Sequence, residues 1–492
     1  MKFWPVLGVS LVLSLLLFAP HREMLSQQNG VAAGTKAGSA TTQRIFFSFE
    51  HDLWDEVVGA DLKLEPMTKY SGNPVLPRGP LGAPDSGRVS YTSLFPEGGR
   101  LRAWYGAMEE KAQKYAGIGY AESEDGIHWT KPNLDLAKPG TNLVIGAEGQ
   151  AALLTVVPDD TGNGKSYRGL IHFLRPANGG HEQATFQVMT SPDGLHWNFT
   201  KTPATDIPAT EELGLYRRNG EWWVLGQGIS PYFSLPDGEP HGRVTYGFHS
   251  RDGVKWELFP LPLFWYPFNP DFPDSSLQQH MGPAIWDRGR IVLGIAGQLH
   301  PASFSQYVGM TLGLMYSYDG MKWTEPFPAT AILKLGPKGS WDSGWHLQVQ
   351  QPVSRGKSTY FFYSGSDGGN LIDTHFALGL ALLRRDGFAA YTANRDKATL
   401  VTAPLECIPG EVTLYLNLAG RMTVQILDQY MDPVSSPKLV EADDVRIPAL
   451  DLRELKLPPK FRLAFRMSEG AKLYTFSFGP TESELSSLSG WE

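Results

Sequence analysis

The sequence predicts an all-β protein, with a five-bladed β-propeller followed by a small C-terminal β-sandwich. Three observations predict this fold: a motif that recurs at near-regular spacing, two β-rich runs before each copy, and a change of pattern near residue 402. The 53 Gly and 37 Pro among 492 residues favour frequent turns over long helices.

The recurring motif is Ser-x-Asp-Gly-x-(His or Lys)-Trp, and its aspartates are 59 to 68 residues apart. Each copy follows two β-forming runs, such as RLRAWYGA and then AGIGYAES. Asp-Gly favours a tight turn in which Gly takes positive φ, and the Trp is expected to pack between neighbouring sheets. We therefore interpret the motif as structural, with four short strands per unit and five units closing a ring over residues 44–402. The copies end at Trp129, Trp197, Trp256 and Trp323, and a degenerate fifth contains Asp386 and Gly387.

Residues 403–492 have a different texture. GEVTLYLNLAGRMTVQILDQ and AKLYTFSFG alternate apolar and polar residues with period two, and the motif is absent. This pattern predicts a β-sandwich beside the ring.

The N-terminus predicts export. An apolar run from Trp4 to Pro20 follows Lys2, so residues 1–22 are interpreted as a signal peptide or an uncleaved signal anchor, and both options stay open. Residues 23–43 are polar and are expected to be a linker. We expect a secreted or extracytoplasmic protein, with an N-terminal membrane anchor as the open alternative. Asn198-Phe199-Thr200 is a glycosylation sequon that has meaning only in a eukaryotic secretory pathway.

Composition excludes several classes of protein. The net charge of −8 argues against a nucleic-acid binder, which needs a basic face. The single cysteine, Cys407, excludes a disulfide framework and a Cys-rich zinc site. The sequence contains no phosphate-binding Gly loop, no H-E-x-x-H and no G-x-S-x-G, and no cofactor or metal is expected.

In a propeller the first strand of each blade lines the central channel, so carboxylates at the starts of these strands are candidates for catalysis. Three of them occur in Asp-Ser pairs, and crowded carboxylates supply the acid and the base of glycoside hydrolysis. An Asp-Ser pair can equally be an Asx turn that caps a loop, and either of the two adjacent glutamates could face the channel. The candidate catalytic residues are Asp85, Glu211, Glu212, Asp274 and Asp342.

Aromatic and histidine side chains lie near the same strand starts. Flat rings stack on sugar faces, and the histidines could bind substrate hydroxyls, hold a metal or serve only as hydrogen-bonded framework. The candidate substrate-binding residues are Trp265, Trp341, Trp345, His280 and His346.

These patterns resemble the five-bladed glycoside hydrolases of the clan that includes families 32, 43, 68 and, more distantly, 130. The phrases NPVLPRGP, AESEDGIHWTKPNL, GSWDSGW and LGLALLRRDGF are similar to those of secreted, uncharacterised family-32-like proteins with a C-terminal β-sandwich. The resemblance covers residues 44–480. It implies a first-blade nucleophile or base at Asp85 and a third-blade acid at Glu211 or Glu212.

The sequence departs from that family at two points. The second-blade aspartate has no match, since Glu148 stands at that place, and the invertase phrases W-x-N-D-P-N-G and R-D-P are absent. Glu406 lies in LECIP, which is similar to the clan's E-C-P phrase, but it follows the fifth unit and is interpreted as structural. Invertase or fructanase activity is therefore not expected.

Two main hypotheses follow. The first is a carbohydrate-active enzyme, a glycoside hydrolase whose carboxylates meet in the central pocket and whose partner is a carbohydrate. The second is a non-catalytic glycan-binding or scaffold propeller with the same pocket. Sialidase-like chemistry is a weaker third, because the required arginine triad cannot be placed. Oligomeric state, sugar and linkage are not indicated.

Overall fold

The computed structural model describes residues 43–492 apart from 111–113, 147–150, 163–165, 177–181, 200–210, 230–242, 267–277, 304–305, 369–374, 482–487, 489 and 492. The described residues are all-β, with two 3-10 turns, η2 (His51–Leu53) and η4 (Leu452–Glu454), and no α-helix among them. They contain no helix long and apolar enough to cross a membrane. The predicted signal segment and linker lie outside the described residues, apart from Gln43.

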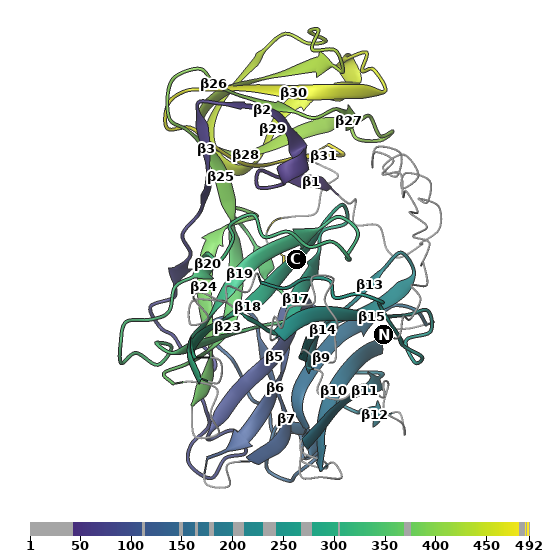
Figure 1. The fold of residues 1–492 in the computed structure, drawn as a ribbon, viewed down its shortest axis with the longest axis vertical. Helices are drawn as coiled ribbons and strands as arrows, with labels where there is room; N and C mark the ends of the chain where they lie inside the picture. The colour runs from purple at the N-terminus through teal and green to yellow at the C-terminus, as the bar shows by residue number, and fades with distance from the viewer. Residues whose placement is uncertain are drawn as a thin grey trace, which may run out of the picture. The chain divides into compact units, whose positions relative to one another are not determined.

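The described strands between residues 68 and 384 form five antiparallel meanders (Figure 1). The first contains β5 (Arg88–Glu97), β6 (Arg100–Glu109), β7 (Lys114–Ser123) and β8 (Leu143–Gly146). The second contains β9 (Ala151–Asp159), β10 (Ser166–Pro176), β11 (Glu182–Ser191) and β12 (Asn198–Phe199). The third contains β13 (Glu211–Arg218), β14 (Glu221–Ile229), β15 (Arg243–Ser250) and β16 (Glu257–Leu258). The fourth contains β17 (Gln278–Asp287), β18 (Val292–Ser303), β19 (Gln306–Ser317) and β20 (Ala331–Leu333).

The fifth meander closes with a strand from the beginning of the chain. It contains β21 (Trp345–Gln348), β22 (Val353–Arg355), β23 (Ser358–Ser366), β24 (Phe376–Arg384) and β4 (Thr68–Lys69). Strand β4 pairs with β24, so residues that precede the first meander complete the last one. A parallel bridge between Phe376 and Arg88 then joins the fifth meander to the first.

The motif turns follow one local pattern. Asp125 accepts hydrogen bonds of 2.8 Å from the backbone N–H groups of Ile127 and His128, and Gly126 takes a φ of 77°. The turns at Asp193, Asp252 and Asp319 repeat these bonds. The carboxylate therefore holds each turn in place of a further backbone bond.

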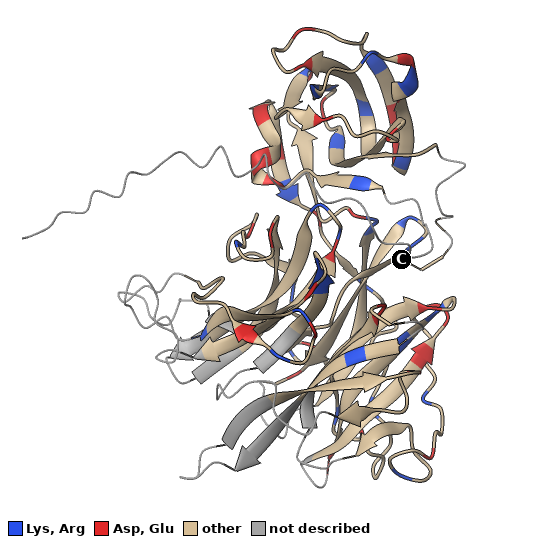
Figure 2. Ribbon diagram, turned by 90° about the vertical axis from the view of Figure 1, so that its right-hand side faces the viewer, with Lys and Arg blue, Asp and Glu red and all other residues tan. Residues whose placement is uncertain are grey.

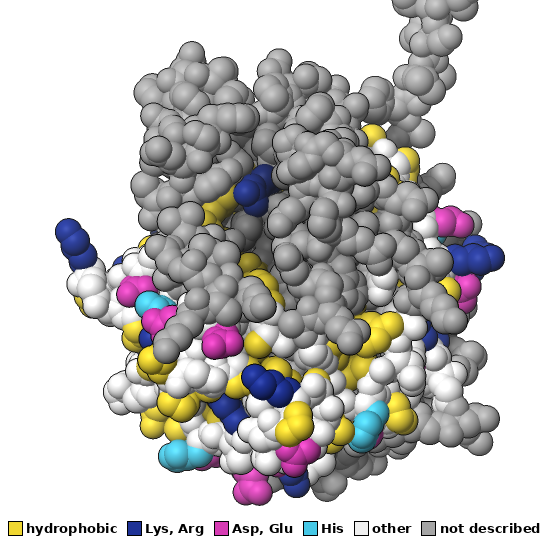
Figure 3. All heavy atoms as spheres, turned by 90° about the horizontal axis from the view of Figure 1, so that it is seen from below, with side chains coloured by type: hydrophobic (Ala, Val, Ile, Leu, Met, Phe, Trp, Pro, Cys, Tyr) yellow, Lys and Arg dark blue, Asp and Glu magenta, His cyan; other side chains and the backbone are white. Residues whose placement is uncertain are grey.

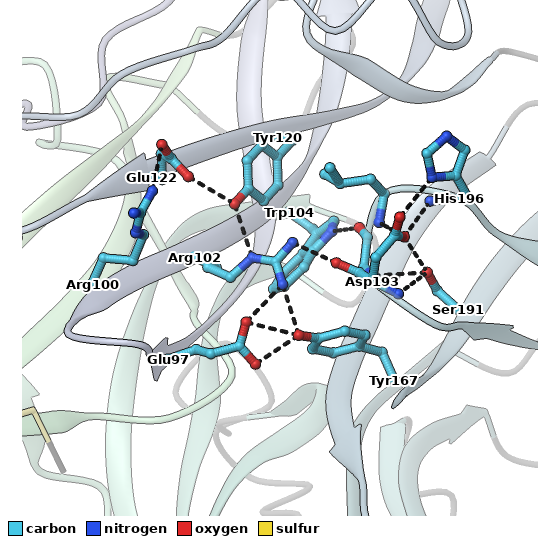
Figure 4. A network of polar contacts seen from close by, with 12 residues as sticks. Glu97, Arg100, Arg102, Trp104, Tyr120, Glu122, Tyr167, Ser191, Asp193 and His196 are labelled. Carbon is cyan, nitrogen blue, oxygen red and sulfur yellow. Dashed lines mark hydrogen bonds and ion pairs between the residues drawn. The ribbon is translucent and has the colours of Figure 1, made fainter. Parts of the chain in front are cut away.

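Arginines that are buried or partly buried connect each meander to the motif turn of the next. Arg102 donates to the Asp193 carbonyl at 2.7 Å and also pairs with Glu97 inside the first meander (Figure 4). A similar arginine contact links each following pair of meanders, and the last one links the fifth meander to the first. The other contacts are Arg168 to the Gly253 carbonyl, Arg218 to the Tyr318 carbonyl, Arg288 to the Asp386 carboxylate and Arg355 to the Glu124 carbonyl.

Two glutamine side chains, one at the end of β21 and one just after it, join meanders that are distant in the sequence. Gln350 donates to the Leu215 carbonyl at 3.1 Å, and Gln348 donates to the Gly282 carbonyl at 3.0 Å. These bonds tie the fifth meander to the third and fourth.

A separate, ten-stranded sheet contains the C-terminal strands. Its apolar positions alternate, so one side of β28 and β30 packs into a core that includes Leu416, Val424 and Phe465. Its strands are β1 (Arg44–Phe47), β2 (Trp54–Val58), β3 (Ala60–Leu64), β25 (Ala389–Ala393), β26 (Ala398–Thr402), β27 (Leu405–Glu406), β28 (Thr413–Asp428), β29 (Lys438–Asp451), β30 (Lys460–Met467) and β31 (Lys472–Gly479).

The strand pairing differs from the predicted division at residue 402. Strands β1 to β3, β25 and β26 belong to the ten-stranded sheet, whereas the prediction assigns residues 44–64 and 389–402 to the ring. The physical reason is that β1, β25 and β26 pair with strands that follow residue 402, and β2 and β3 pair with β26 and β25. Such long-range pairs leave no local sequence signal.

Candidate functional site

Asp85 is buried just before β5, with 3% of its surface exposed. Its carboxylate accepts hydrogen bonds from the Tyr105 hydroxyl at 2.9 Å and the Lys131 ammonium at 2.6 Å. Asn142 donates to the same tyrosine hydroxyl at 2.7 Å. These groups neutralise Asp85 and shield it from solvent.

Asp342 occupies the equivalent position before β21 and is also 3% exposed. The Tyr363 hydroxyl donates to it at 2.9 Å, Lys69 forms an ion pair with it, and the His346 ring lies 3.5 Å away. Burial alone would raise the pKa of Asp342, but the His346 ring and the Lys69 ammonium outweigh burial and hold that pKa well below its usual range. Asp342 is therefore ionised throughout the physiological pH range.

The two aspartates close two similar loops. Residues 79–87 read GPLGAPDSG and residues 336–344 read GPKGSWDSG. A Cβ atom at the first glycine of either loop, Gly79 or Gly336, would collide with the aspartate of its own loop. Each carboxylate therefore sits against a glycine and fixes the shape of the loop.

The fourth meander carries a different charged residue at the position that corresponds to Lys131. Lys131 and Glu325 each lie six residues after the aspartate of their motif turn, so a carboxylate replaces the lysine. Glu325 accepts hydrogen bonds from the Tyr266 hydroxyl at 2.6 Å and from Gln298 at 3.2 Å. Burial raises the pKa of Glu325, and these hydrogen bonds only partly offset it.

A pocket of about 440 Å³ lies beside the two loops, at the seam between the fifth and first meanders. It is at the end of the meanders where β5 and β24 begin, and residues from both loops line it. The lining residues are Pro74, Pro77, Arg78, Gly79, Leu81, Ser86, Glu110, Trp341, Asp367, His375, Phe376 and Ala377.

Charged groups of both signs line one wall of the pocket. His375 Nε2 lies 3.2 Å from one oxygen of Glu110, and Arg78 lies 3.8 Å from the other. Ser86 braces both residues, since its carbonyl accepts from Arg78 at 2.6 Å and its hydroxyl accepts from the Glu110 N–H at 3.1 Å. Arg78, Glu110 and His375, which we call the polar wall, are partly exposed and offer both donors and acceptors to a ligand.

The indole of Trp341 forms another part of the lining. Its ring stacks on Tyr363, with ring centroids 5.8 Å apart and planes inclined by 24°. A Cβ atom at Gly365 or Gly379 would lie 2.7 or 2.8 Å from the indole carbons, so the ring fits against two positions without side chains. Trp341 is consequently held in one orientation.

The structure places the other candidate residues in different surroundings. Trp345 and His346 are buried, with 2% and 0% of their surfaces exposed, and Trp265 packs against the core that contains Trp222. Glu211, Glu212 and His280 lie in described strands, but their side chains fall outside the described part, as does the whole of Asp274. Of the ten candidates, Trp341 lines the pocket.

Sequence reasoning missed the charged residues that line this pocket. Arg78, Glu110, Asp367 and His375 come from loops and strand ends that carry no recurring motif. The available signal was the loop pattern G-P-x-G-x-x-D-S-G, which occurs before β5 and before β21. Within the described residues no group of three His, Cys, Asp or Glu side chains is placed to hold a metal ion.

The surface charge is mixed. Figure 2 shows basic and acidic residues interspersed along the described strands and loops, and Figure 3, the view from below, shows described side chains of both charges scattered among apolar and uncharged ones.

No family model and no curated protein matches the chain. Among solved structures it is similar to an N-acetylgalactosamine deacetylase from F. plautii in complex with blood group B trisaccharide, with 15% identity over 65% of this chain and 95% of that chain and a TM-score of 0.47. A glycosyl hydrolase from Bacteroides ovatus has 12% identity over 65% and 94%, with a TM-score of 0.44.

A family 43 arabinoxylan arabinofuranohydrolase from Bacillus subtilis, in complex with cellotetraose, has 10% identity over 84% of this chain and 99% of that chain, with a TM-score of 0.38. Likeness at this level carries no information about reaction or substrate.

Proposed function

We propose that this chain is a carbohydrate-active protein that binds a sugar in the pocket between the fifth and first meanders. The observation that carries the proposal is the immobilised indole of Trp341 in the same pocket as Arg78, Glu110 and His375. An indole face stacks on the C–H face of a sugar, while hydroxyl groups need donors and acceptors side by side. The mixed charge of the polar wall suits a sugar better than a phosphate.

Glycoside hydrolysis is the proposed reaction. It needs one carboxyl group as an acid and a second as a base or nucleophile. Glu110 and Asp367 are the carboxylates among the pocket-lining residues, and the roles of Glu211, Glu212 and Asp274 stay predictions. The contacts of Asp85 and Asp342 with lysine and tyrosine favour a supporting role for them over a catalytic one.

A non-catalytic glycan-binding protein is the second candidate. It is favoured by one observation, which is that two of the five candidate catalytic carboxylates are engaged in buried ion pairs. In this case the pocket would hold the sugar and no bond would break.

The wider architecture is part of the proposal. We take the five meanders as the blades of a five-bladed propeller, supported by the arginine contacts that run from each meander to the next and return to the first. The ten-stranded sheet is taken as the β-sandwich. A secretory signal or anchor in residues 1–22 and an extracytoplasmic location complete the proposal.

The test is a screen of the purified chain against fructans, arabinans, mannosides and galactans, with binding measured by calorimetry and cleavage by reducing-sugar release. We expect one class to bind, and Trp341→Ala to weaken that binding about tenfold, equivalent to 1.4 kcal/mol. Glu110→Gln should abolish cleavage while binding persists, and Glu122→Gln, on the exposed Arg100 pair, is the matched control. Binding without cleavage by the unaltered chain would select the second candidate.

A further inference from the structure

Leu81 is an exposed apolar residue of the pocket lining. It lies in the loop of residues 79–87, and 65% of its surface is exposed. An isolated exposed leucine on a flexible loop would need no explanation. The surroundings of Leu81 differ in two respects: the loop is braced, and the leucine borders a cavity.

Backbone hydrogen bonds brace this loop on both sides of Leu81. Ala83 N–H donates to the Pro80 carbonyl at 2.9 Å, and Ser86 N–H donates to the Ala83 carbonyl at 3.1 Å. Gly79 N–H donates to the Asp85 carbonyl at 3.3 Å, which closes the base of the loop. Pro80 also fixes the backbone φ angle directly before Leu81. The leucine is therefore held in solvent at a defined position.

The pocket lining contains apolar residues in addition to the charged ones. They are Pro74, Pro77, Leu81, Phe376 and Ala377, together with the indole of Trp341. Exposed apolar surface at the rim of a pocket marks a place where a ligand buries its own apolar surface. A bare sugar would satisfy Trp341 and the polar wall but would leave Leu81 in water.

We propose that the ligand is a sugar that carries an apolar substituent, such as an aryl, alkyl or acyl group, and that Leu81 contacts this substituent. The inference rests on the proposed function and specifies its substrate class. The sugar ring stacks on Trp341 and bonds to the polar wall, while the substituent lies against Leu81 and the neighbouring prolines.

The experiment compares methyl and p-nitrophenyl glycosides of the sugar found in the screen, with dissociation constants measured by calorimetry on the full chain. We expect the p-nitrophenyl glycoside to bind about tenfold more tightly than the methyl glycoside. In Leu81→Ser this ratio should fall to about one. Leu439→Ser, an exposed leucine of β29 that is 48% exposed, is the matched control and should keep the ratio of the unaltered chain.

The outcomes separate the two proposals. Equal affinity for both glycosides, or an unchanged ratio in Leu81→Ser, would overturn the role of Leu81 and leave the sugar pocket standing. Failure of every glycoside to bind would overturn the proposed function itself. Trp341→Ala should weaken both glycosides and preserve their ratio, since the indole contacts the part that they share.

Discussion

The hydroxyl of Tyr105 lies 2.9 Å from the carboxylate of Asp85 and donates a hydrogen bond to it. Tyr363 and Asp342 repeat this contact at the same distance in the fifth meander. In each case a lysine binds the same carboxylate oxygen as the tyrosine. The duplication places one such cluster behind each of the two loops that contribute to the pocket, which explains why Asp-Ser recurs there without requiring that either aspartate react with substrate.

Removing the lysine of one cluster should destabilise the protein. Lys131→Met leaves Asp85 charged and buried, and we expect the free energy of unfolding to fall by about 3 kcal/mol in urea titrations. Lys357→Met is the control, because Lys357 pairs with Asp444 at 2.7 Å in an exposed position and should cost less than about 1 kcal/mol. The double variant Asp85→Asn/Lys131→Met should lose less than the sum of its two single variants. Additive losses would show that the pair is not coupled.

Asp342 should stabilise the fold in a pH-dependent way. Its pKa is lower in the folded chain than in the unfolded chain, so its contribution is fully present above the ordinary carboxyl pKa and is lost as the pH falls below about 4. At pH 7 the free energy of unfolding of the unaltered chain should exceed that of Asp342→Asn by about 2 kcal/mol, and this difference should shrink towards pH 3. Unfolding measured in urea from pH 3 to 7 tests this, and a constant difference would contradict it.

Glu325 should make the stability of the fold change with pH in the direction opposite to that of Asp342. Burial raises its pKa in the folded chain, so ionising it opposes folding, and stability should fall as the pH rises through the ordinary carboxyl range. Glu325→Gln cannot ionise, and it should therefore gain stability relative to the unaltered chain between pH 4 and pH 8. The shift of the melting temperature with pH, recorded for both proteins, measures the difference. A gap that widens in favour of the unaltered chain would refute the assignment.

The arginine contacts between meanders predict a contrast between two neighbouring residues. Arg102 is buried and donates to Glu97, Tyr167 and the Asp193 carbonyl, whereas Arg100 pairs with Glu122 at the surface. Arg102→Met should cost about 3 kcal/mol because these acceptors lose their donor inside the protein. Arg100→Met should cost less than about 1 kcal/mol. Equal losses of unfolding free energy in chemical denaturation would show that the buried contacts of Arg102 stabilise the fold no more than the exposed pair of Arg100.

The local parts of this fold are visible in the sequence, and the long-range parts are not. The motif turns could be predicted because Asp125 bonds to residues only two and three positions further along. Strand β1 could not be assigned to the ten-stranded sheet, since Arg44 pairs with Phe478 near the other end of the chain. Its four residues are too few for an alternating pattern to identify a partner.

The same distinction applies to the pocket. Glu110 follows a hairpin strand and His375 precedes β24, and nothing in either segment indicates that the two side chains lie 3.2 Å apart. They meet because the fifth meander borders the first. The Asp-Ser pairs were found because they recur, but recurrence alone cannot distinguish a carboxylate that faces a ligand from one that a lysine neutralises.

Two equivalent glycines provide the sharpest test of Trp341. A Cβ at Gly119 or at Gly379 would lie 2.5 or 2.6 Å from the ring of the paired tyrosine, and only the one at Gly379 would also press on the indole, at 2.8 Å. Gly119→Ala and Gly379→Ala should thus destabilise the fold by similar amounts, about 1–3 kcal/mol, as overpacking does. Only Gly379→Ala should also weaken sugar binding, because the added methyl group forces the indole to move. Calorimetry at a temperature where both variants remain folded measures the difference, and equal affinities would mean that the orientation of Trp341 does not govern binding.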